Sequence, residues 1–355
     1  MLHRIRIENF KCIREQLFSM APLTILTGEN SSGKSTLIQA LLMVRASRDK
    51  YKFVNPDEVF PQKIGAISQL ISQDFQGNRQ ITISVVLDEE ERTFQYRLAG
   101  ESNQRLEIIG DRWQSGVFPT IQYLNAERIG PRLYTGFGDS ERLLCPDGSN
   151  AAYLLNQAEQ EGLLIPAALR NEDEPQKLTY QVEKYLSAIV GRLELNYDID
   201  LDSAFIRTMM RTSATNKPVT EPLTGFGFSY AFPVVVAGLL CTCSPNTILI
   251  VENPEAHLHP SAQSNMGRFL ALIASCGVQV IVETHSEHII DGARLQMADN
   301  HMAEQMIIHF FSNRDSGLEI RQIEVNSAGE LSAWPKGFFD QKQQDLRELL
   351  RMRRG

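Results

Sequence analysis

The stretch Gly28-Glu29-Asn30-Ser31-Ser32-Gly33-Lys34-Ser35 matches the pattern GxxxxGK followed by Ser or Thr, without a gap. A hydrophobic run from Leu23 to Thr27 precedes it, and helical apolar spacing from Thr36 to Arg45 follows. Strand, glycine loop and helix in this order form the setting that a phosphate-binding loop requires. The glycines let backbone N–H groups turn toward a phosphate, and the helix adds the positive end of its dipole. The stretch therefore predicts an α/β protein that binds nucleotide phosphates.

Two side chains of this loop add chemistry that its backbone lacks. Lys34 can reach the β- and γ-phosphates of a nucleotide, and the Ser35 hydroxyl can ligate Mg²⁺. We therefore expect ATP and Mg²⁺ as ligands. A purely structural glycine turn is the alternative, and the flanking strand and helix argue against it. The predicted nucleotide-binding residues of this region are Gly28, Glu29, Asn30, Ser31, Ser32, Gly33, Lys34, Ser35 and Thr36.

Length and composition fit one large domain or two lobes, since the chain has 355 residues, of which 43% are hydrophobic and 22% charged. Five scattered cysteines without a CxxC pair indicate reduced thiols in a cytoplasmic protein. The longest apolar stretch, Ala231 to Cys243, is shorter than the ~20 residues of a membrane-spanning helix. We expect a soluble protein without a membrane partner. The net charge of -8 argues against a wholly basic surface, while a local patch for DNA stays open.

Hydrophobic patterns outline the rest of the fold. Strands are predicted at 2–10, 81–87, 93–98 and 121–124, with 81–87 and 93–98 as an antiparallel pair. Runs of β-branched residues at 247–251 and 278–282 indicate buried parallel strands, and helical spacing covers about 151–193 and 230–243.

These patterns predict a single α/β head over residues 1–355 with a mixed sheet. Residues 1–148 and 224–355 are expected to form the nucleotide-binding core, which includes the antiparallel β section. Residues 149–223 are expected to form a helical lobe. Long coiled-coil arms are not expected, because no sustained heptad pattern is present.

A second motif combines a hydrophobic strand with acids in Ile248-Leu249-Ile250-Val251-Glu252-Asn253-Pro254-Glu255-Ala256-His257-Leu258-His259-Pro260. A strand that ends in an acid can place a carboxylate beside the Mg²⁺ held by Ser35. Here the chain resembles the SMC/ABC-like ATPases of the overcoming-lysogenization-defect class, whose hallmark is an acidic pair followed by Pro-Glu and His-Leu-His-Pro. The resemblance implies Ser35 and Glu252 as metal ligands and a dimer-crossing role for the His-Leu-His-Pro segment.

One departure from that class bears on hydrolysis. The second acid, which polarises the attacking water, is replaced by Asn253, and an amide cannot accept a proton at neutral pH. Either Glu252 or Glu255 positions the water, or hydrolysis is slow. A metal site formed by His257, His259 and Glu255 is a further alternative.

The third motif is Val280-Ile281-Val282-Glu283-Thr284-His285-Ser286, a buried strand that ends in Thr-His-Ser. The resemblance gives His285 the role of the switch histidine that contacts the γ-phosphate. The predicted catalytic residues are therefore Glu252, Glu255 and His285.

The segment Leu223-Thr224-Gly225-Phe226-Gly227-Phe228-Ser229 comes just before the second motif, where ABC-type heads keep their signature loop. The resemblance implies that Gly227 and Ser229 bind the γ-phosphate of a nucleotide held by the opposite subunit. An ordinary helix N-cap is the alternative.

Two further stretches, Tyr123 to Arg132 and the Trp-Pro-Lys-Gly-Phe-Phe-Asp sequence of residues 334–340, resemble a subfamily of bacterial AAA-type ATPases, several of which occur in phage-defence operons beside a nuclease. Arg128 is a candidate phosphate contact, while Trp334 and the two Phe residues are expected to pack the C-terminal part of the chain.

Taken with the motifs, the resemblance implies an ATP-hydrolysing, SMC-like head that dimerises around ATP and gates a partner effector. That effector is expected to be a nuclease encoded nearby, in antiviral defence or DNA processing. The alternatives are a nucleotide-binding scaffold with little hydrolysis and a transporter ATPase subunit.

Overall fold

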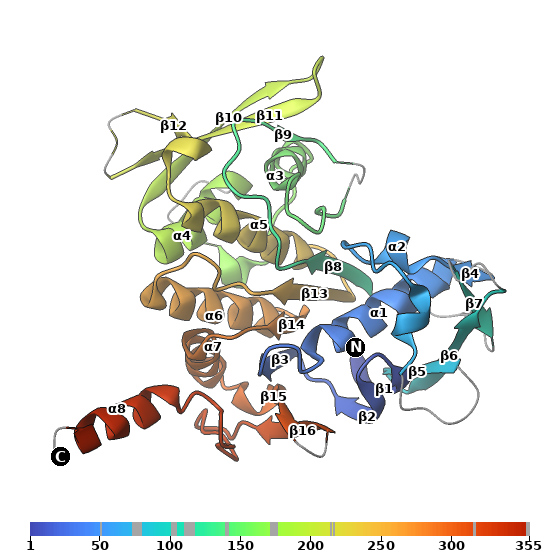
Figure 1. Cartoon of the computed structure of the whole chain (residues 1–355). Helices are drawn as coiled ribbons and strands as arrows, with labels where there is room; N and C mark the ends of the chain where they lie inside the picture. The colour runs from blue at the N-terminus through green and yellow to red at the C-terminus, as the bar shows by residue number, and fades with distance from the viewer. Residues whose placement is uncertain are drawn as a thin grey trace.

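The computed structural model describes residues 1–49, 52–72, 80–100, 105–109, 118–138, 142–170, 177–213, 215, 217–314 and 317–352. Its centre is a sheet in the order β16-β15-β3-β14-β13-β8 (Figure 1). Neighbouring strands are parallel except for the antiparallel pair β15 and β16. The strands are β3 (Leu23–Gly28), β8 (Thr120–Leu124), β13 (Thr247–Glu252), β14 (Gln279–Glu283), β15 (Met306–Arg314) and β16 (Gly317–Glu324).

A second sheet is antiparallel and lies beside α1 (Lys34–Asp49), with the order β2-β1-β5-β6-β7-β4. It confirms the antiparallel section predicted from 81–87 and 93–98. Its strands are β1 (Leu2–Phe10), β2 (Ile13–Ser19), β4 (Phe53–Val54), β5 (Gln80–Leu87), β6 (Glu90–Leu98) and β7 (Leu106–Ile109), and the short helices α2 (Pro56–Val59) and η1 (Ile67–Leu70) connect parts of it.

On the other side of the central sheet lie five helices (Figure 1), namely α3 (Ala151–Gln160), α4 (Leu178–Val190), α5 (Phe226–Cys241), α6 (Pro260–Ser275) and α7 (Glu287–Asp299). The chain ends in α8 (Gln341–Met352), with short 3-10 turns at η2 (Ala167–Leu169), η3 (Glu221–Leu223) and η4 (Ala303–Gln305). Among the described residues, no helix is long and apolar enough to span a lipid bilayer.

Residues 149–223, predicted as a helical lobe, are only partly helical. That segment holds α3 and α4, but also β10 (Leu193–Asp200), β11 (Phe205–Thr212) and β12 (Val219–Thr220), which form a separate antiparallel sheet with β9 (Thr135–Gly136). The period-two alternation Leu193, Leu195, Tyr197, Ile199 is a strand signal at the point where the helical pattern was expected to end.

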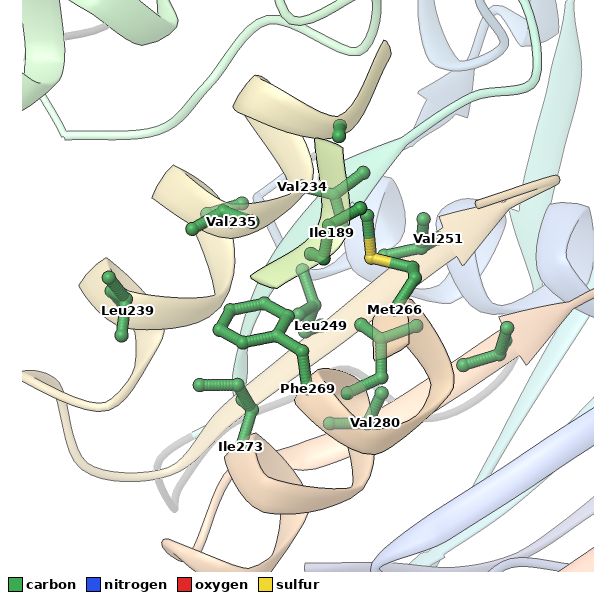
Figure 2. Close-up of a cluster of buried hydrophobic side chains, with 14 of the residues drawn as sticks. Ile189, Val234, Val235, Leu239, Leu249, Val251, Met266, Phe269, Ile273 and Val280 are labelled. Carbon is green, nitrogen blue, oxygen red and sulfur yellow. The ribbon is translucent and has the colours of Figure 1, made fainter. Parts of the chain in front are cut away.

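The central sheet separates two hydrophobic cores. Along β13, Leu249 and Val251 belong to one core, while Ile248 and Ile250 belong to the other. This strand therefore alternates between two buried faces, which explains its uninterrupted apolar sequence. Figure 2 shows the first core, where side chains from α4, α5 and α6 meet those of β13 and β14; it labels Ile189, Val234, Val235, Leu239, Leu249, Val251, Met266, Phe269, Ile273 and Val280.

The Trp-Pro-Lys-Gly-Phe-Phe-Asp segment packs against the core through Phe338 and the partly buried Phe339. Phe338 is buried and lies edge-on to Phe310 of β15, with 5.4 Å between ring centroids. Trp334 touches the Phe338 ring but is exposed.

Helices α6 and α7 cross at two glycines. A Cβ atom on Gly267 would lie 2.1 Å from the carbonyl oxygen of Ile289, and one on Gly292 would lie 2.0 Å from that of Ser264. Both obstructing atoms belong to backbone, so neither can rotate away. The crossing therefore requires glycine on both helices.

Replacing Gly292 with Ala should destabilise the fold by about 2 kcal/mol or more, because overpacking against backbone exceeds the ~1 kcal/mol gained in helix propensity. Urea unfolding measures this change. Gly136→Ala is the matched control, since no atom lies within 4 Å of its added Cβ. Equal stability of the two variants would contradict the requirement.

Candidate nucleotide site at the carboxyl edge of the central sheet

The loop after β3 is fixed to the neighbouring strand β15. Gly28 has φ 131°, and a Cβ atom there would lie 1.9 Å from the carbonyl oxygen of Phe311. The Glu29 N–H donates to that same oxygen at 3.0 Å, and the Glu29 carboxylate accepts from the Asn313 N–H at 2.9 Å. Only glycine satisfies the first position, so the glycine of the motif sets where the loop begins.

Lys34 is buried and folds back into its own loop. Its ammonium donates to the carbonyl oxygens of Glu29 at 2.6 Å and Gly28 at 3.2 Å. Burial lowers the pKa of Lys34, while the charges of Glu283 and Glu29 oppose that change. Ser32 donates to the Glu29 carbonyl at 2.7 Å, which closes the loop further. The ammonium thus lies inside the loop, where phosphate oxygens can replace the carbonyls as its acceptors.

Ser35 faces an acid that sequence reasoning did not select. Its hydroxyl donates to the two carboxylate oxygens of Glu283 at 3.0 and 3.3 Å. Glu283 is the last residue of β14, and its Cα pairs in register with that of Glu252 on β13. Tyr123, from β8, donates its hydroxyl to Glu252 at 2.9 Å. Three strand ends therefore bring their polar groups to one edge of the sheet.

These oxygen groups fit Mg²⁺. A hydroxyl and two carboxylates are hard ligands of the type that Mg²⁺ uses together with nucleotide phosphates. Burial and the charge of Glu252 raise the pKa of Glu283 to about 7, so a cation at this position would offset a real electrostatic cost. Within the described ranges, no group of three or more His, Cys, Asp or Glu side chains forms a self-contained metal site, which removes the His257, His259 and Glu255 alternative.

Glu255 is engaged in hydrogen bonds to the segment after β14. Its carboxylate accepts from the Thr284 hydroxyl at 2.7 Å and from the His285 N–H at 2.6 Å. The imidazole of His285 is exposed, and burial followed by the charge of Lys34 lowers its pKa. Glu255 therefore holds the backbone that presents His285, instead of extending a free carboxylate.

The two histidines of the His-Leu-His-Pro segment have structural partners. His259 caps α6 by accepting from the Ser261 N–H, and the His257 ring lies against Phe226 and Tyr230 of α5. His257 therefore connects this segment to the start of α5.

The start of α5 differs from the prediction. The helix begins at Phe226 instead of Tyr230, so Ser229 lies inside it, buried, with its hydroxyl donating to Glu221 at 2.9 Å. Gly227 packs against the His257 carbonyl, which would lie 3.3 Å from an added Cβ. Gly225 is the N-cap and makes no side-chain capping bond. Thr224, directly before Gly225, is half-buried, and its hydroxyl donates to the Glu221 carbonyl at 2.8 Å.

Arg128 also departs from expectation. It does not reach toward the phosphate-binding loop, because its guanidinium is buried and donates to the backbone carbonyls of Glu252, Asn253 and Asn125.

A phosphate loop, an acid-bearing strand and a histidine-bearing strand in this spatial order define a P-loop ATPase of the SMC/ABC type. The chain belongs to the AAA ATPase domain family, whose model matches residues 1–127 and 148–290. A second model, for a protein family of unknown function (DUF3696), matches residues 302–349.

Two curated relatives confirm the resemblance to the overcoming-lysogenization-defect class. The Old nuclease of Escherichia phage P2 is 23% identical over 341 residues, covering 81% of this chain and 57% of the relative. The OLD nuclease of Thermus scotoductus is 25% identical over 338 residues, covering 83% of this chain and 61% of the relative. The chain thus spans 57% and 61% of the length of these relatives, less than two thirds of either.

Solved SMC heads share the fold. An SMC head bound to the C-winged helix domain of ScpA has a TM-score of 0.56 at 14% identity, covering 91% of this chain and 98% of that one. A Pyrococcus furiosus SMC head with an extended coiled coil, bound to the C-terminal domain of ScpA, has a TM-score of 0.56 at 13% identity, covering 98% of this chain and 99% of that one.

The raised pKa of Glu283 predicts a pH dependence of stability. Between the ordinary value of 4.5 and about 7, the folded protein binds more protons at this carboxyl than the unfolded chain does. Stability from this group is therefore lost as pH rises through that window. Without Mg²⁺ or nucleotide, raising the pH from about 5 to about 8 should lower the melting temperature of the wild type more than that of Glu283→Gln. Melting temperatures that fall by equal amounts with pH in the two proteins would contradict this.

Proposed function

We propose that this chain binds and hydrolyses ATP, pairs with a second copy around the nucleotide, and gates a nuclease-type effector in a DNA-processing or anti-phage complex. The observation that carries the proposal is the convergence of Lys34, Ser35, Glu252 and Glu283 at one sheet edge. A cytoplasmic location is proposed with it, supported by five free cysteines.

In the proposed mechanism, Lys34 exchanges the carbonyls of Gly28 and Glu29 for phosphate oxygens. Ser35, Glu252 and Glu283 would hold Mg²⁺, which when bound supplies charge stabilisation to the phosphates. His285 would contact the γ-phosphate from the end of β14. These residues orient the reacting groups, which is the main contribution a protein makes to phosphoryl transfer.

No acid described at this site is free to serve only as the general base that activates the attacking water. Asn253 cannot accept a proton, and both carboxylate oxygens of Glu255 already accept hydrogen bonds. Glu252 and Glu283 are the remaining acids, and both have the second task of holding Mg²⁺. We therefore propose slow turnover, and a scaffold with little hydrolysis stays the second candidate function.

The second copy would approach the start of α5. Here Leu223 is 74% exposed and Phe226 is 53% exposed, beside the uncapped N–H groups that follow Gly225. A helix start with free N–H groups suits the γ-phosphate of a nucleotide held by another subunit.

The nuclease link is proposed from the relatives. Both curated relatives are named nucleases, and both are longer than the part matched here. We propose that this head acts together with a nuclease and that DNA is the substrate of the complex.

Lys34→Ala should weaken binding of a fluorescent ATP analogue by about tenfold or more, because the γ-phosphate loses its charged partner. Glu252→Gln should retain binding but lower kcat by about tenfold or more. Nucleotide titration and phosphate release measure the two effects. Unchanged binding in Lys34→Ala would reject the site.

Asn253→Glu should raise kcat about tenfold by supplying the missing base, whereas Glu255→Gln should lower it by disturbing the His285 backbone. Steady-state phosphate release compares the two. No measurable turnover in the wild type or in Asn253→Glu would leave the scaffold as the function.

Thr224→Ala should weaken ATP-dependent pairing about tenfold or more, because this half-buried hydroxyl lies directly before the N-cap of α5. Ser229→Ala, in contrast, should mainly alter stability, since it removes a buried bond to Glu221. Light scattering with ATP in the Glu252→Gln background measures pairing. The opposite ranking would restore Ser229 as the contact.

A further inference from the structure

Arg128 is a buried cation at the junction of two strand ends. Its side chain is 3% exposed. One terminal nitrogen donates to the carbonyl oxygens of Glu252 at 2.6 Å and Asn125 at 2.9 Å, and the other donates to that of Asn253 at 2.5 Å. A planar guanidinium can serve several carbonyls at once, which a single ammonium cannot do with the same geometry. Arg128 thus joins the end of β8 to the end of β13.

The same guanidinium faces α5. Its central carbon lies 5.4 Å from the ring centroid of Tyr230, a cation–π contact. The Tyr230 ring lies 4.5 Å from that of His257, which lies 5.1 Å from the ring of Phe226, the first residue of α5. A continuous series of contacting groups therefore runs from Arg128 to the start of the helix.

The carbonyls held by Arg128 belong to the turn that carries the acids of the site. Asn253 adopts φ 45°, and its N–H donates to the carbonyl oxygen of Glu283 at 2.8 Å. A shift of this turn would displace Glu252 and the end of β14 together. The positive charge of Arg128 also lies near Glu252 and Glu255, so it offsets part of the negative charge of the site.

Polar atoms of this turn are incompletely paired. Among the described residues, the buried side-chain atoms without a hydrogen-bond partner include Nε of Arg128 and the Oδ1 atoms of Asn125 and Asn253. Buried unpaired polar groups cost free energy, so a rearrangement that paired them would lower the free energy of the turn.

We infer that Arg128 is a positioning residue that couples the acid-bearing turn of a subunit's own nucleotide site to the start of α5, which faces the nucleotide of the second copy. This inference rests on the proposed function. ATP bound to the phosphate loop adjusts the turn, and Arg128 with Tyr230 and His257 carries that adjustment to the helix start. Loss of the coupling spares nucleotide binding and impairs pairing and hydrolysis.

The test compares Arg128→Lys, Tyr230→Leu, Tyr230→Phe and the Arg128→Lys/Tyr230→Leu double variant. Arg132→Lys is the matched control, because Arg132 lies in the same loop with an exposed side chain whose guanidinium bonds only to the Pro131 carbonyl among the contacts described. Each protein is assayed for binding of a fluorescent ATP analogue, for phosphate release, for pairing by light scattering with ATP in the Glu252→Gln background, and for melting temperature.

In Arg128→Lys and Tyr230→Leu we expect Kd for the ATP analogue within about threefold of the wild type. We expect kcat and pairing to fall about tenfold or more, because small displacements of catalytic groups lower reaction rates strongly. Tyr230→Phe keeps the ring and should behave as the wild type. The double variant should be no worse in kcat than Arg128→Lys alone, because the two residues act through one contact.

Two results overturn the inference. If Arg128→Lys is folded and keeps the kcat and the ATP-dependent pairing of the wild type, the guanidinium does not couple the turn to α5. A purely structural role would be shown if nucleotide binding weakened and the melting temperature fell together, with additive effects in the double variant. If the wild type neither hydrolyses ATP nor pairs with it, the proposed function fails and the coupling fails with it; if the wild type does both, failure of the coupling stands alone.

Discussion

The in-register parallel pairing of β13 with β14 is the constraint on which the rest of the site depends. It sets Glu252 and Glu283 side by side at the end of adjacent strands, so their side chains leave the same face of the sheet. Two buried carboxylates in this arrangement repel each other and resist ionisation. Surrounding groups offset that cost: Lys34, the first residue of α1, brings a positive charge, and Tyr123 and Ser35 each donate a hydroxyl.

The phosphate loop could be predicted from the sequence because all of its chemistry lies within eight consecutive residues. Glu283 could not be predicted in the same way. A single Glu at the end of a buried strand is common, and only the register between strands distant in sequence places it beside Ser35. The order of the central sheet likewise depends on long-range pairing that no local pattern encodes, whereas the type of each strand followed from its β-branched residues.

Errors in the lobe between residues 149 and 223, and at the start of α5, have a local cause. The alternation from Leu193 to Ile199 was present in the sequence, but it followed directly on a helical pattern. Helix α5 is apolar on all sides, so its periodicity gave no boundary, and its start was predicted four residues too late. Only the three-dimensional structure shows that Ser229 is held by a buried hydrogen bond to Glu221.

The glycine crossing of α6 and α7 has a consequence for motion. Helix α6 begins at Pro260, the last residue of the His-Leu-His-Pro segment, and α7 begins at Glu287, two residues after His285. Because backbone meets backbone at Gly267 and Gly292, the two helices cannot slide past each other without a steric clash. We therefore expect the two loops at the helix starts to move together. A displacement of His285 would then also shift the loop that contains His257.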